Sequence, residues 1–425
     1  MMRMAVGARR NSRLGIISAF GMAFAVVAAT PALAARPHKH RAAQKTAAEK
    51  PPPPLAVPLD QIHVLGGIPA PFELEAKAAY LIDVDTGAVL YAYAEHQKMQ
   101  PASLAKIMTF YLALNALKAG KISLDTKMPV SEQAWRLSVD QTVSHMFLEV
   151  GQQVAVRDLL YGLMVSSGND AAVVVAEYLG GSAESFTKMM NDEAARIGLS
   201  ETHFDNPDGL PAEGEYTTAS DMVKLGHTLL RDHPEALTYT SAKEFTFHDI
   251  VQRNFNTLLF YDARVDGIKT GHVDEAGYHL VASAKSNGMR LISAVMGTKN
   301  MEKRRLETDK LLDWAFRTFV DYRPNLKASV PASLPVRGGV AETVAIGPAT
   351  DAVFTLPRGE ETKAAIQFTP AAAYLEAPVP SGSQVGEISI TLAGKPIATV
   401  PVVTQAGVGR AGFFERMRQK LHRAL

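Results

Sequence analysis

The chain has 425 residues, 47% of them hydrophobic, and its 44 Lys and Arg nearly balance 43 Asp and Glu. It is too long for one ordinary domain and too apolar for a disordered protein. Because Cys is absent, disulfides, thiolate zinc sites, iron–sulfur clusters and Cys nucleophiles are excluded. Basic residues gather at both ends, which leaves residues 51–404 acidic and argues against nucleic-acid binding by this part of the chain.

The first 34 residues have the parts of an export signal. Four arginines begin the segment and are followed by an uncharged apolar run over residues 14–30, and Ala32-Leu33-Ala34 is a small-x-small cleavage site. A short membrane anchor is the alternative, but the run is at the lower length limit for spanning a bilayer. We therefore expect residues 1–34 to be a signal peptide and the mature protein to be periplasmic.

The next segment, residues 35–65, is basic and contains the polyproline run 51–54. It has no apolar face to bury, so we expect a linker that is extended or disordered. His38 and His40 do not indicate a metal site, because nothing nearby completes a set of ligands.

Residues 66–322 have the pattern of a mixed α and β domain. The predicted elements, in chain order, are strands over 78–84 and 89–93, a helix over 103–117, several helices between 132 and 232, strands over 265–270, 278–285 and 289–296, and a helix over 301–322. One of the middle helices begins at Thr218 as N-cap, with Asp221 three residues later. Asn287-Gly288 is the predicted turn of the last hairpin. This order predicts an α+β fold, one sheet flanked by a helical cluster.

The C-terminal part of the chain changes character twice. Residues 323–404 are rich in Pro, Gly and short Val and Ile runs, which predicts a small all-β domain without a catalytic constellation. Residues 405–425 predict a basic amphipathic helix. Its apolar side chains recur at helical spacing, at Phe413, Phe414, Met417, Leu421, Ala424 and Leu425.

That amphipathic helix is too short and too charged to span a bilayer. Packing on the preceding domain is the alternative, but its basic face would gain nothing from a protein core. We therefore predict that residues 407–425 lie on an anionic membrane surface, and that the protein attaches peripherally to the outer face of the inner membrane.

Ser103-Leu104-Ala105-Lys106 opens the long apolar helix of the mixed domain. A spacing of three puts the Ser103 hydroxyl and the Lys106 amine on one helical face. Burial lowers the pKa of a lysine, which would let Lys106 act as a general base toward Ser103. Such a pair alone carries little weight, because about one or two are expected by chance in a chain of this size. A second one, Ser185-Phe186-Thr187-Lys188, lies among charged residues, and we expect it on a solvated helix face.

Two further motifs carry polar side chains of the right kinds. Ser167-Gly168-Asn169 lies between two predicted helices, where a hydroxyl and an amide can orient a lysine and a substrate amide; helix capping is the alternative. Lys269-Thr270-Gly271 ends a predicted edge strand, where a lysine and a hydroxyl can bind a carboxylate and Gly271 allows close approach; a simple strand end with a turn glycine is the alternative.

Together, and in this order, the three motifs resemble the active-site triplet of the serine penicillin-recognising enzymes, which include penicillin-binding proteins and serine β-lactamases. Other segments narrow the resemblance to the low-molecular-mass D-alanyl-D-alanine carboxypeptidases of the peptidase S11 type. These segments are 101–103, 146–148, 166–171, 206–211, 265–272 and 276–284. The β domain and the terminal helix match the stalk and the membrane anchor of that family more loosely. Ala105 departs from the family, whose members often have Thr there.

The resemblance implies a transpeptidase-like fold with an antiparallel sheet over residues 66–322, and a hydrolase that acts on peptidoglycan stem peptides. It would remove the terminal D-alanine of a pentapeptide through an acyl-enzyme on Ser103. Lys106 would take the proton of Ser103, and Ser167 would relay a proton to the leaving D-alanine. β-Lactams would act as inhibitors, and neither a metal nor another cofactor is implied.

The resemblance also assigns substrate-binding roles. Asn169 would hold Lys106 and the substrate amide. Lys269 and Thr270 would bind the terminal carboxylate, and the charge of Lys269 would help to keep Lys106 neutral. Gly271 would let the substrate backbone come close, and the backbone N–H groups of Ser103 and His272 would form the oxyanion hole.

Three other functions compete with this one. A serine β-lactamase of the commonest type would use a Glu-x-x-x-Asn pattern, and no Glu between residues 170 and 269 is followed four residues later by Asn. A D-alanyl endopeptidase acting on peptidoglycan cross-links uses the same triplet, but specialised forms usually lack the β domain and the anchor. A non-catalytic penicillin or wall sensor would be favoured by the loss of a motif, and all three are present.

Overall fold

The structure is a computed structural model that describes residues 68–424. The predictions of a signal peptide over residues 1–34 and of a linker over residues 35–65 therefore lie outside the described residues. The described helices and strands all belong to one compact unit.

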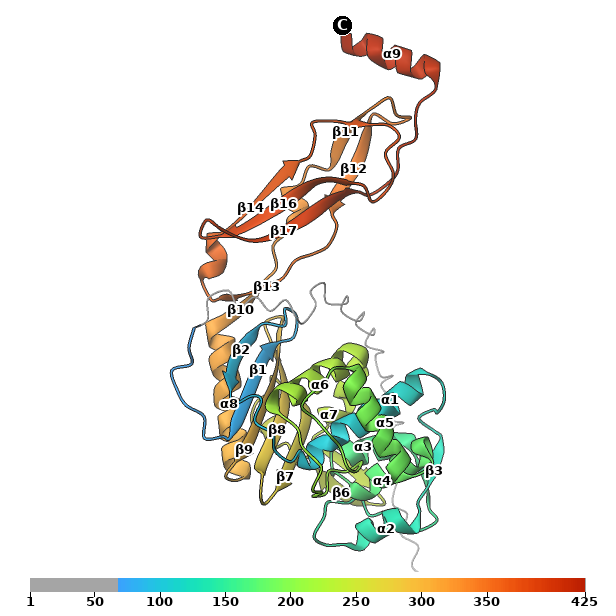
Figure 1. The fold of residues 1–425 in the computed structure, drawn as a ribbon, viewed down its shortest axis with the longest axis vertical. Coiled ribbons are helices and arrows are strands. Elements are labelled where there is room, and N and C mark those ends of the chain that lie inside the picture. Colours follow the sequence, from blue (N-terminus) through green and yellow to red (C-terminus); the bar gives the residue numbers. More distant parts are fainter. Residues whose placement is uncertain (1–67, 425) are drawn as a thin grey trace, which may run out of the picture. The chain divides into compact units, whose positions relative to one another are not determined.

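A five-stranded antiparallel sheet organises the first region of the described chain (Figure 1). Its strands are β1 (Ala78–Asp83), β2 (Val89–Tyr93), β7 (Val265–Val273), β8 (Gly277–Ser286) and β9 (Met289–Thr298). Their order across the sheet is β2-β1-β9-β8-β7, and every neighbouring pair is antiparallel. The predicted Asn287-Gly288 turn joins β8 to β9, and both residues have positive φ, as such a tight hairpin requires. The sheet thus ends in β7, which exposes one backbone edge.

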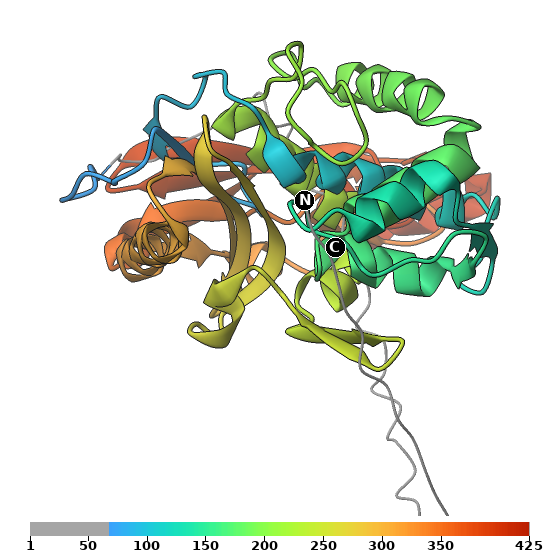
Figure 2. The same ribbon diagram turned by 90° about the horizontal axis from the view of Figure 1, so that it is seen from below.

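Helices cover the two faces of the sheet. Figure 2 shows α8 (Met301–Thr318) on one face and the helical cluster on the other. The cluster consists of α1 (Lys106–Lys118), α2 (Glu132–Val139), α3 (Val156–Met164), α4 (Asn169–Gly180), α5 (Ala183–Arg196), α6 (Ala219–Asp232) and the short α7 (Leu237–Thr240). As predicted, Thr218 caps α6, accepting a hydrogen bond from the Asp221 backbone N–H at 3.2 Å. The predicted antiparallel sheet with a helical cluster is confirmed.

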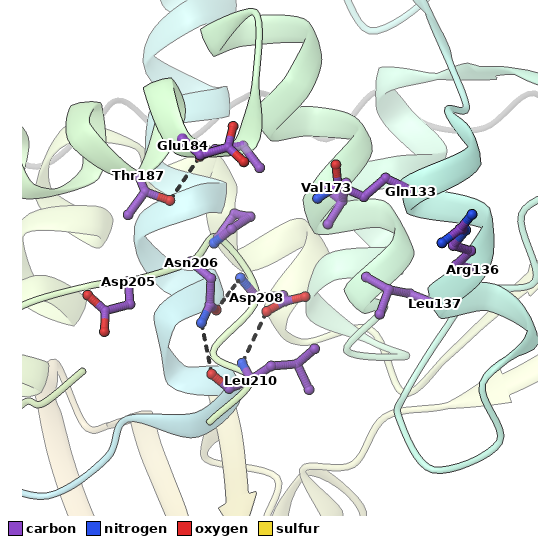
Figure 3. A pocket seen from close by; sticks show the side chains of 12 residues that line it. Gln133, Arg136, Leu137, Val173, Glu184, Thr187, Asp205, Asn206, Asp208 and Leu210 are labelled. Atoms are coloured by element: carbon purple, nitrogen blue, oxygen red, sulfur yellow. Dashed lines mark hydrogen bonds between the residues drawn. The ribbon is translucent and has the colours of Figure 1, made fainter. Parts of the chain in front are cut away.

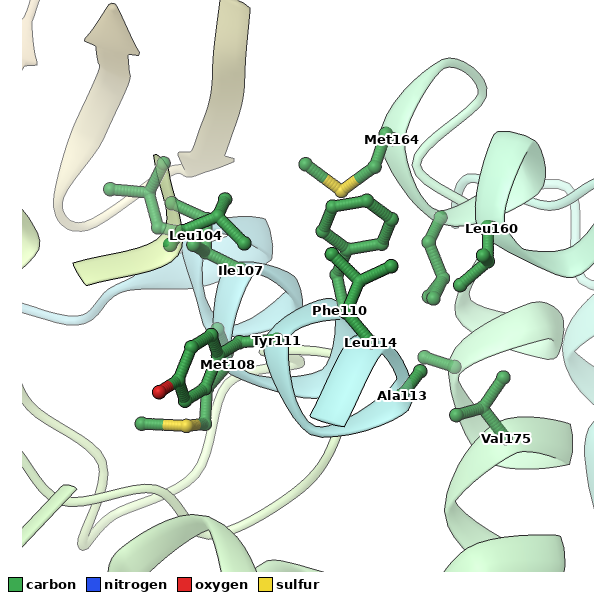
Figure 4. Close-up of a cluster of buried hydrophobic side chains, with 14 of the residues drawn as sticks. Leu104, Ile107, Met108, Phe110, Tyr111, Ala113, Leu114, Leu160, Met164 and Val175 are labelled. Carbon is green, nitrogen blue, oxygen red and sulfur yellow. The ribbon is translucent and has the colours of Figure 1, made fainter. Parts of the chain in front are cut away.

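Helix α1 runs through the middle of the helical cluster. Its side chains are buried on nearly every side, including Phe110, Tyr111 and Leu114, so the helix lacks a polar face (Figure 4). Leu160 of α3 and Val175 of α4 belong to the same apolar core. A helix buried all round is held in one position by packing on every face. The residues at its start are therefore held as rigidly as the core.

Two small antiparallel sheets of two strands each complete this region, and the second of them is a hairpin. They pair β3 (Lys127–Pro129) with β4 (Gln153–Ala155), and β5 (Glu244–Phe247) with β6 (Ile250–Arg253). Gln152, just before β4, lies 2.9 Å from His248 of this hairpin through their side-chain nitrogens. This contact joins the end of the loop after α2 to the hairpin.

The structure corrects two of the predicted element ends. The helix predicted over 301–322 stops at Thr318, and Phe319–Tyr322 form strand β10 instead, paired with β13 (Phe354–Pro357). Pairing with a distant segment overrides the local helical pattern of the apolar residues Phe319 and Val320. The strand predicted to end near Thr270 continues to Val273, because it pairs with β8 along its whole length.

The second region forms the predicted all-β structure. Its six-stranded sheet contains β11 (Ser333–Arg337), β12 (Thr343–Pro348), β14 (Ala364–Pro370), β15 (Leu375–Glu376), β16 (Gln384–Leu392) and β17 (Lys395–Thr404). Alternate residues of β16, such as Ile388 and Ile390, are buried in a core of their own.

The chain closes with helix α9 (Phe413–Ala424). Phe413, Phe414 and Met417 are exposed, and Gln419 donates to the Gly339 carbonyl at 3.1 Å. Within residues 68–424, none of the helices combines the length and the apolar character that a membrane crossing requires.

Candidate active site

Ser103 lies in a 3₁₀ turn (Ala102–Ala105) that leads directly into α1. Ala102 has a left-handed backbone with φ of 51°, which non-glycine residues rarely adopt and which often marks a functional turn. Two glycines allow other segments to reach this turn. A Cβ on Gly209 would lie 1.9 Å from the Ala102 carbonyl oxygen, and one on Gly271 would lie 2.9 Å from the Pro101 carbonyl oxygen. The turn is thus in close contact with the loop that contains Gly209 and with strand β7, and the Ser103 side chain is half-buried.

Lys106 is fully buried at the start of α1. Its Nζ lies 3.1 Å from the Ser103 Oγ, 2.5 Å from the Asn169 Oδ1 and 2.5 Å from the Asp208 carbonyl oxygen. Burial lowers the pKa of Lys106 from 10.5 to about 8, although the nearby carboxylates of Asp208 and Asp170 act in the opposite direction. The sequence predicted both the proximity of Ser103 and Lys106 and a lowered pKa, and the geometry agrees with both.

Ser167 and Asn169 occupy the junction between α3 and α4, as their positions in the sequence predicted. Ser167 has φ of 57°, which turns the chain sharply between the two helices. Its Oγ accepts a hydrogen bond from the Lys269 Nζ at 2.9 Å. Asn169 donates its backbone N–H to the Ser144 carbonyl at 2.8 Å, and its side-chain Oδ1 accepts from the Lys106 Nζ. Hydrogen bonds thus hold both the backbone and the side chain of Asn169. The alternative role of this motif, helix capping, is not observed at α4. The N-cap residue of that helix is Gly168, which has no side chain to accept a hydrogen bond.

Lys269, Thr270 and Gly271 lie inside β7 rather than at its end, so the interpretation of this motif as a simple strand end is wrong. Lys269 is buried, and burial together with repulsion from Lys106 and Arg304 lowers its pKa well below 10.5. Every second N–H and C=O group of an outer strand lacks a strand partner and stays available to a peptide. β7 therefore offers a lysine, a hydroxyl and an open backbone edge beside Ser103.

His272 is the last of the predicted binding residues, and its ring is partly exposed. It stacks on Tyr278 of the paired strand, with 3.8 Å between the ring centroids. Its Nε2 lies 3.6 Å from the Asp274 carboxylate, away from the Ser103 and Lys106 contacts. This arrangement suits a contribution from the His272 backbone better than one from its imidazole.

The three motifs therefore meet although they lie far apart in sequence. Ser103 bonds to Lys106, Lys106 to Asn169, and Ser167 to Lys269, which links α1, the α3–α4 junction and β7 through polar contacts.

Comparison with known proteins agrees with this geometry. Residues 67–300 match the model of the D-alanyl-D-alanine carboxypeptidases of peptidase family S11, which is more than half of the chain. The chain belongs to the D-alanyl-D-alanine carboxypeptidase family.

Individual relatives of this carboxypeptidase match almost their whole length. The D-alanyl-D-alanine carboxypeptidase DacA of Escherichia coli K12 is 38% identical over 361 residues, which cover 84% of this chain and 90% of the relative. DacC of the same organism is 40% identical over 347 residues, covering 81% and 87%. The crystal structure of penicillin-binding protein 5 from Haemophilus influenzae is 38% identical and covers 80% of this chain and 99% of its own, with a TM-score of 0.69.

The β region is part of the same likeness. Residues 325–410 match the C-terminal domain of penicillin-binding protein 5. The carboxypeptidase is thus a serine-type hydrolase followed by the all-β domain typical of that group.

The loop 205–210 has a part in the site that the sequence did not reveal. Thr109 of α1 donates to the Pro207 carbonyl at 2.6 Å, and Asn206 accepts from the Gly209 N–H at 2.6 Å. These bonds aim the Asp208 carbonyl at Lys106. Every residue has a backbone carbonyl, so the sequence does not reveal which one contacts Lys106. Only the Asn and Gly around Asp208 indicate a special turn.

Asp170 was also missed as a positioning residue. Its buried carboxylate accepts hydrogen bonds from the Ser138 hydroxyl at 2.6 Å and from the backbone N–H groups of Met146 and Leu148 at 3.0 and 3.3 Å. It thereby ties the loop after α2 to the start of α4, next to Asn169. Its place beside Asn169 was the available signal, but its partners are more than 20 residues away.

His279 and Arg304 support the other side of the site. The buried His279 lies 3.1 Å from the Gln100 carbonyl and accepts from the Gly297 N–H at 2.9 Å, so it links β8 and β9 to the segment before Ser103. Burial lowers the pKa of His279 to about 4. Arg304 is buried near Lys269, and burial lowers the pKa of Arg304 to about 10. Among residues 68–424, His, Asp and Glu nowhere gather in a group of three that would hold a metal ion.

Proposed function

We propose that Ser103 is the nucleophile of the carboxypeptidase and Lys106 its general base. The observation that carries this proposal is the set of Lys106 partners. A neutral amine has two hydrogens and one lone pair. The Asn169 oxygen and the Asp208 carbonyl accept the two hydrogens, which leaves the lone pair for the Ser103 hydroxyl. Burial lowers the pKa of Lys106 to about 8, so a useful fraction is neutral near pH 7.

The carboxylate of the terminal D-alanine would bind at Lys269 and Thr270. An approaching carboxylate raises the pKa of Lys269 and so restores its charge where the substrate needs it. Arg304, buried nearby, adds a second positive charge to this end of the site. This pair of cations accounts for a preference for a free C-terminal carboxylate, which defines a carboxypeptidase.

The reaction would then follow two steps. Ser103 attacks the carbonyl between the two D-alanines while Lys106 takes its proton, and the oxyanion is held by the backbone N–H groups of Ser103 and His272. Ser167, hydrogen-bonded to Lys269, relays a proton to the leaving D-alanine. Water hydrolyses the acyl-enzyme on Ser103 and releases the shortened peptide. A β-lactam would acylate the same Ser103.

The exposed apolar side of α9 supports a membrane attachment. Phe413, Phe414 and Met417 are exposed by 65%, 83% and 59%, and basic residues follow them in the same helix. Such a helix lies in the interface of an anionic bilayer. We therefore propose that the protein is exported and attaches to the outer face of the inner membrane.

The activity is tested with the exported protein and a mixture of pentapeptide monomers and cross-linked peptidoglycan dimers, followed by mass. The proposal predicts loss of one alanine from the pentapeptides while the dimers stay intact. Dimers falling to monomers would make the enzyme an endopeptidase, and no change in either would favour a sensor.

The membrane proposal predicts that a protein truncated before residue 407 stays in the soluble fraction and keeps its activity on soluble peptides. A truncated protein that still sediments with membranes would contradict it.

A further inference from the structure

Glu215 is a buried carboxyl group beside the active site that the mechanism above does not use. It follows the loop 205–210 in the chain, and only 4% of it is exposed. Neither of its carboxyl oxygens has a hydrogen-bond partner among residues 68–424. An ionised carboxylate without hydrogen-bond donors is costly to bury, so these surroundings favour the neutral acid.

Backbone hydrogen bonds fix the chain next to Glu215. Tyr216 exchanges two of them with His203, at 2.8 and 3.1 Å, just before the loop that contacts the proposed base. Thr217 exchanges two with Met99, at 2.8 and 3.0 Å, in the segment that leads to the proposed nucleophile. Glu215 is therefore held between this loop and this segment, with its side chain inside the protein.

Glu215 differs from the other acids that act on Lys106. Burial lowers the pKa of Lys106, and the charges of three buried acids oppose this effect. They are Asp208, Asp170 and Glu215. The Asp208 carboxylate accepts from the Leu210 N–H at 3.0 Å (Figure 3), and the Asp170 carboxylate accepts from a hydroxyl and two backbone N–H groups. Glu215 has no such donor within the described chain, so it is the acid of the three whose charge is least supported.

Glu215 and Lys106 titrate in the same pH range. Burial raises the pKa of Glu215 from 4.5 to about 8; repulsion from Asp208 and Asp205 acts in the same direction, and the charge of Lys106 in the opposite one. The pKa of Lys106 is also about 8. The ionisable groups on the elements around Glu215 are Lys98, Lys106, Asp170, His203, Asp205 and Asp208. When Glu215 or Lys106 loses a proton, the other therefore holds its own more tightly.

We propose that Glu215 is a positioning residue that acts through Lys106: as a neutral acid it leaves Lys106 free to accept the Ser103 proton, and as a carboxylate it holds Lys106 as an ammonium ion. The inference rests on the proposed role of Lys106 as general base. The site then has two forms of equal net charge. The active form contains a neutral amine and a carboxylic acid, and the inactive form contains an ammonium ion and a carboxylate. Only removal of the Glu215 carboxyl group distinguishes them.

The test compares the rates of penicillin acylation of the wild type and E215Q from about pH 6 to about pH 10. At about pH 6 Glu215 is uncharged in the wild type, so glutamine resembles it, and at about pH 10 Lys106 is neutral in both proteins. We expect equal rates at both ends of the range. Near pH 8, where the ammonium–carboxylate pair forms in the wild type, E215Q should be faster by about threefold. A purely structural defect would instead lower the rate by the same factor at every pH.

Two further variants keep this test specific. E213Q is the matched control, because it removes the same charge from an exposed residue two positions away, and it should equal the wild type at every pH. E215L removes the charge without introducing an amide that needs partners, and it should show the same maximum near pH 8. A ratio to the wild type without that maximum in E215Q and E215L would overturn the inference, while acylation of the wild type at Ser103 would leave the carboxypeptidase function standing. Absence of acylation in the wild type would overturn that function, and the inference with it.

Discussion

The chain contains two Ser-x-x-Lys sequences on two helices, and the structure gives them opposite environments. Lys106 is fully buried and contacts Ser103, Asn169 and Asp208. Lys188 of α5 is 76% exposed and pairs at 2.6 Å with Asp192, one turn further along the same helix. The same four-residue spacing therefore places a buried lysine beside its serine in one helix and a solvated lysine on the surface of the other.

The surroundings of the two pairs, rather than their spacing, produce the chemistry. Ser185 serves its own helix, since its backbone N–H is capped by Ser182 at 3.1 Å. Ser103 instead lies in a turn that a distant loop and strand β7 can approach closely, because they have Gly209 and Gly271 at the contacts. Burial removes water from Lys106 and lowers its pKa, whereas water and a carboxylate surround Lys188.

Apart from loss of Ser103 itself, replacing the buried lysine should have the greatest effect. K106Q keeps a group that donates hydrogens, on a side chain one bond shorter, but it has no basic lone pair. We expect the second-order rate of penicillin acylation to fall about 10³-fold, the size of a general-base contribution. Stopped-flow acylation of the purified variant measures this. A fall of less than tenfold, in a variant with a wild-type melting curve, would remove Lys106 from the role of base.

The pH dependence of acylation should report the lowered pKa of Lys106. Only the neutral amine accepts a proton, so the rate should rise about tenfold per pH unit below pH 8 and level off above it. A lysine with the ordinary pKa of 10.5 would give a rate that still rises at pH 9 and 10. The profile is measured with a penicillin that is stable across the range from about pH 5.5 to 10, and a plateau already at about pH 6 would contradict the assignment.

Replacing the buried Asp170 carboxylate should lower both the stability of the protein and its rate of acylation. D170N puts an amide that donates hydrogens where the Met146 and Leu148 N–H groups need acceptors. We expect a loss of about 2–4 kcal/mol in the free energy of unfolding, and acylation slower by about tenfold. Urea unfolding measures the first. D125N, which removes an 84% exposed carboxylate, is the control and should change stability by less than about 0.5 kcal/mol.

Changes at the exposed pair should have almost no effect. S185A and K188Q should each leave acylation within about twofold of the wild type, because surface changes away from a site have little effect. A steady-state assay on a pentapeptide is sufficient. A large loss in either variant would mean that the two helices are coupled in a way that the contacts do not explain.

The sequence predicted the parts of the fold and of the site that depend on local signals. The Thr218 cap, the Asn287-Gly288 hairpin and the three polar motifs all lie where local patterns and the family resemblance placed them. The end of α8 was missed because Phe319–Tyr322 pair with a segment far along the chain.

The missed site residues have the same physical reason. Asp170, His279 and the Asp208 carbonyl act through partners brought close only by the tertiary fold. A cavity beside the loop 205–210 is also built from separate segments, so no single stretch of sequence predicts it. Its lining includes Gln133, Arg136, Glu184, Asp205, Asp208 and Leu210. A pattern within one segment predicts an element or a motif, whereas contacts between segments require the structure.

Locating the covalent adduct decides which of the two pairs is catalytic. The wild-type protein is incubated with a penicillin, digested, and the adduct is mapped by mass spectrometry to a single peptide. We expect one adduct, on the peptide that contains Ser103, and none in S103A with an unchanged melting curve. An adduct on the Ser185 peptide, or full labelling of S103A, would contradict the claim that the buried pair is the catalytic one.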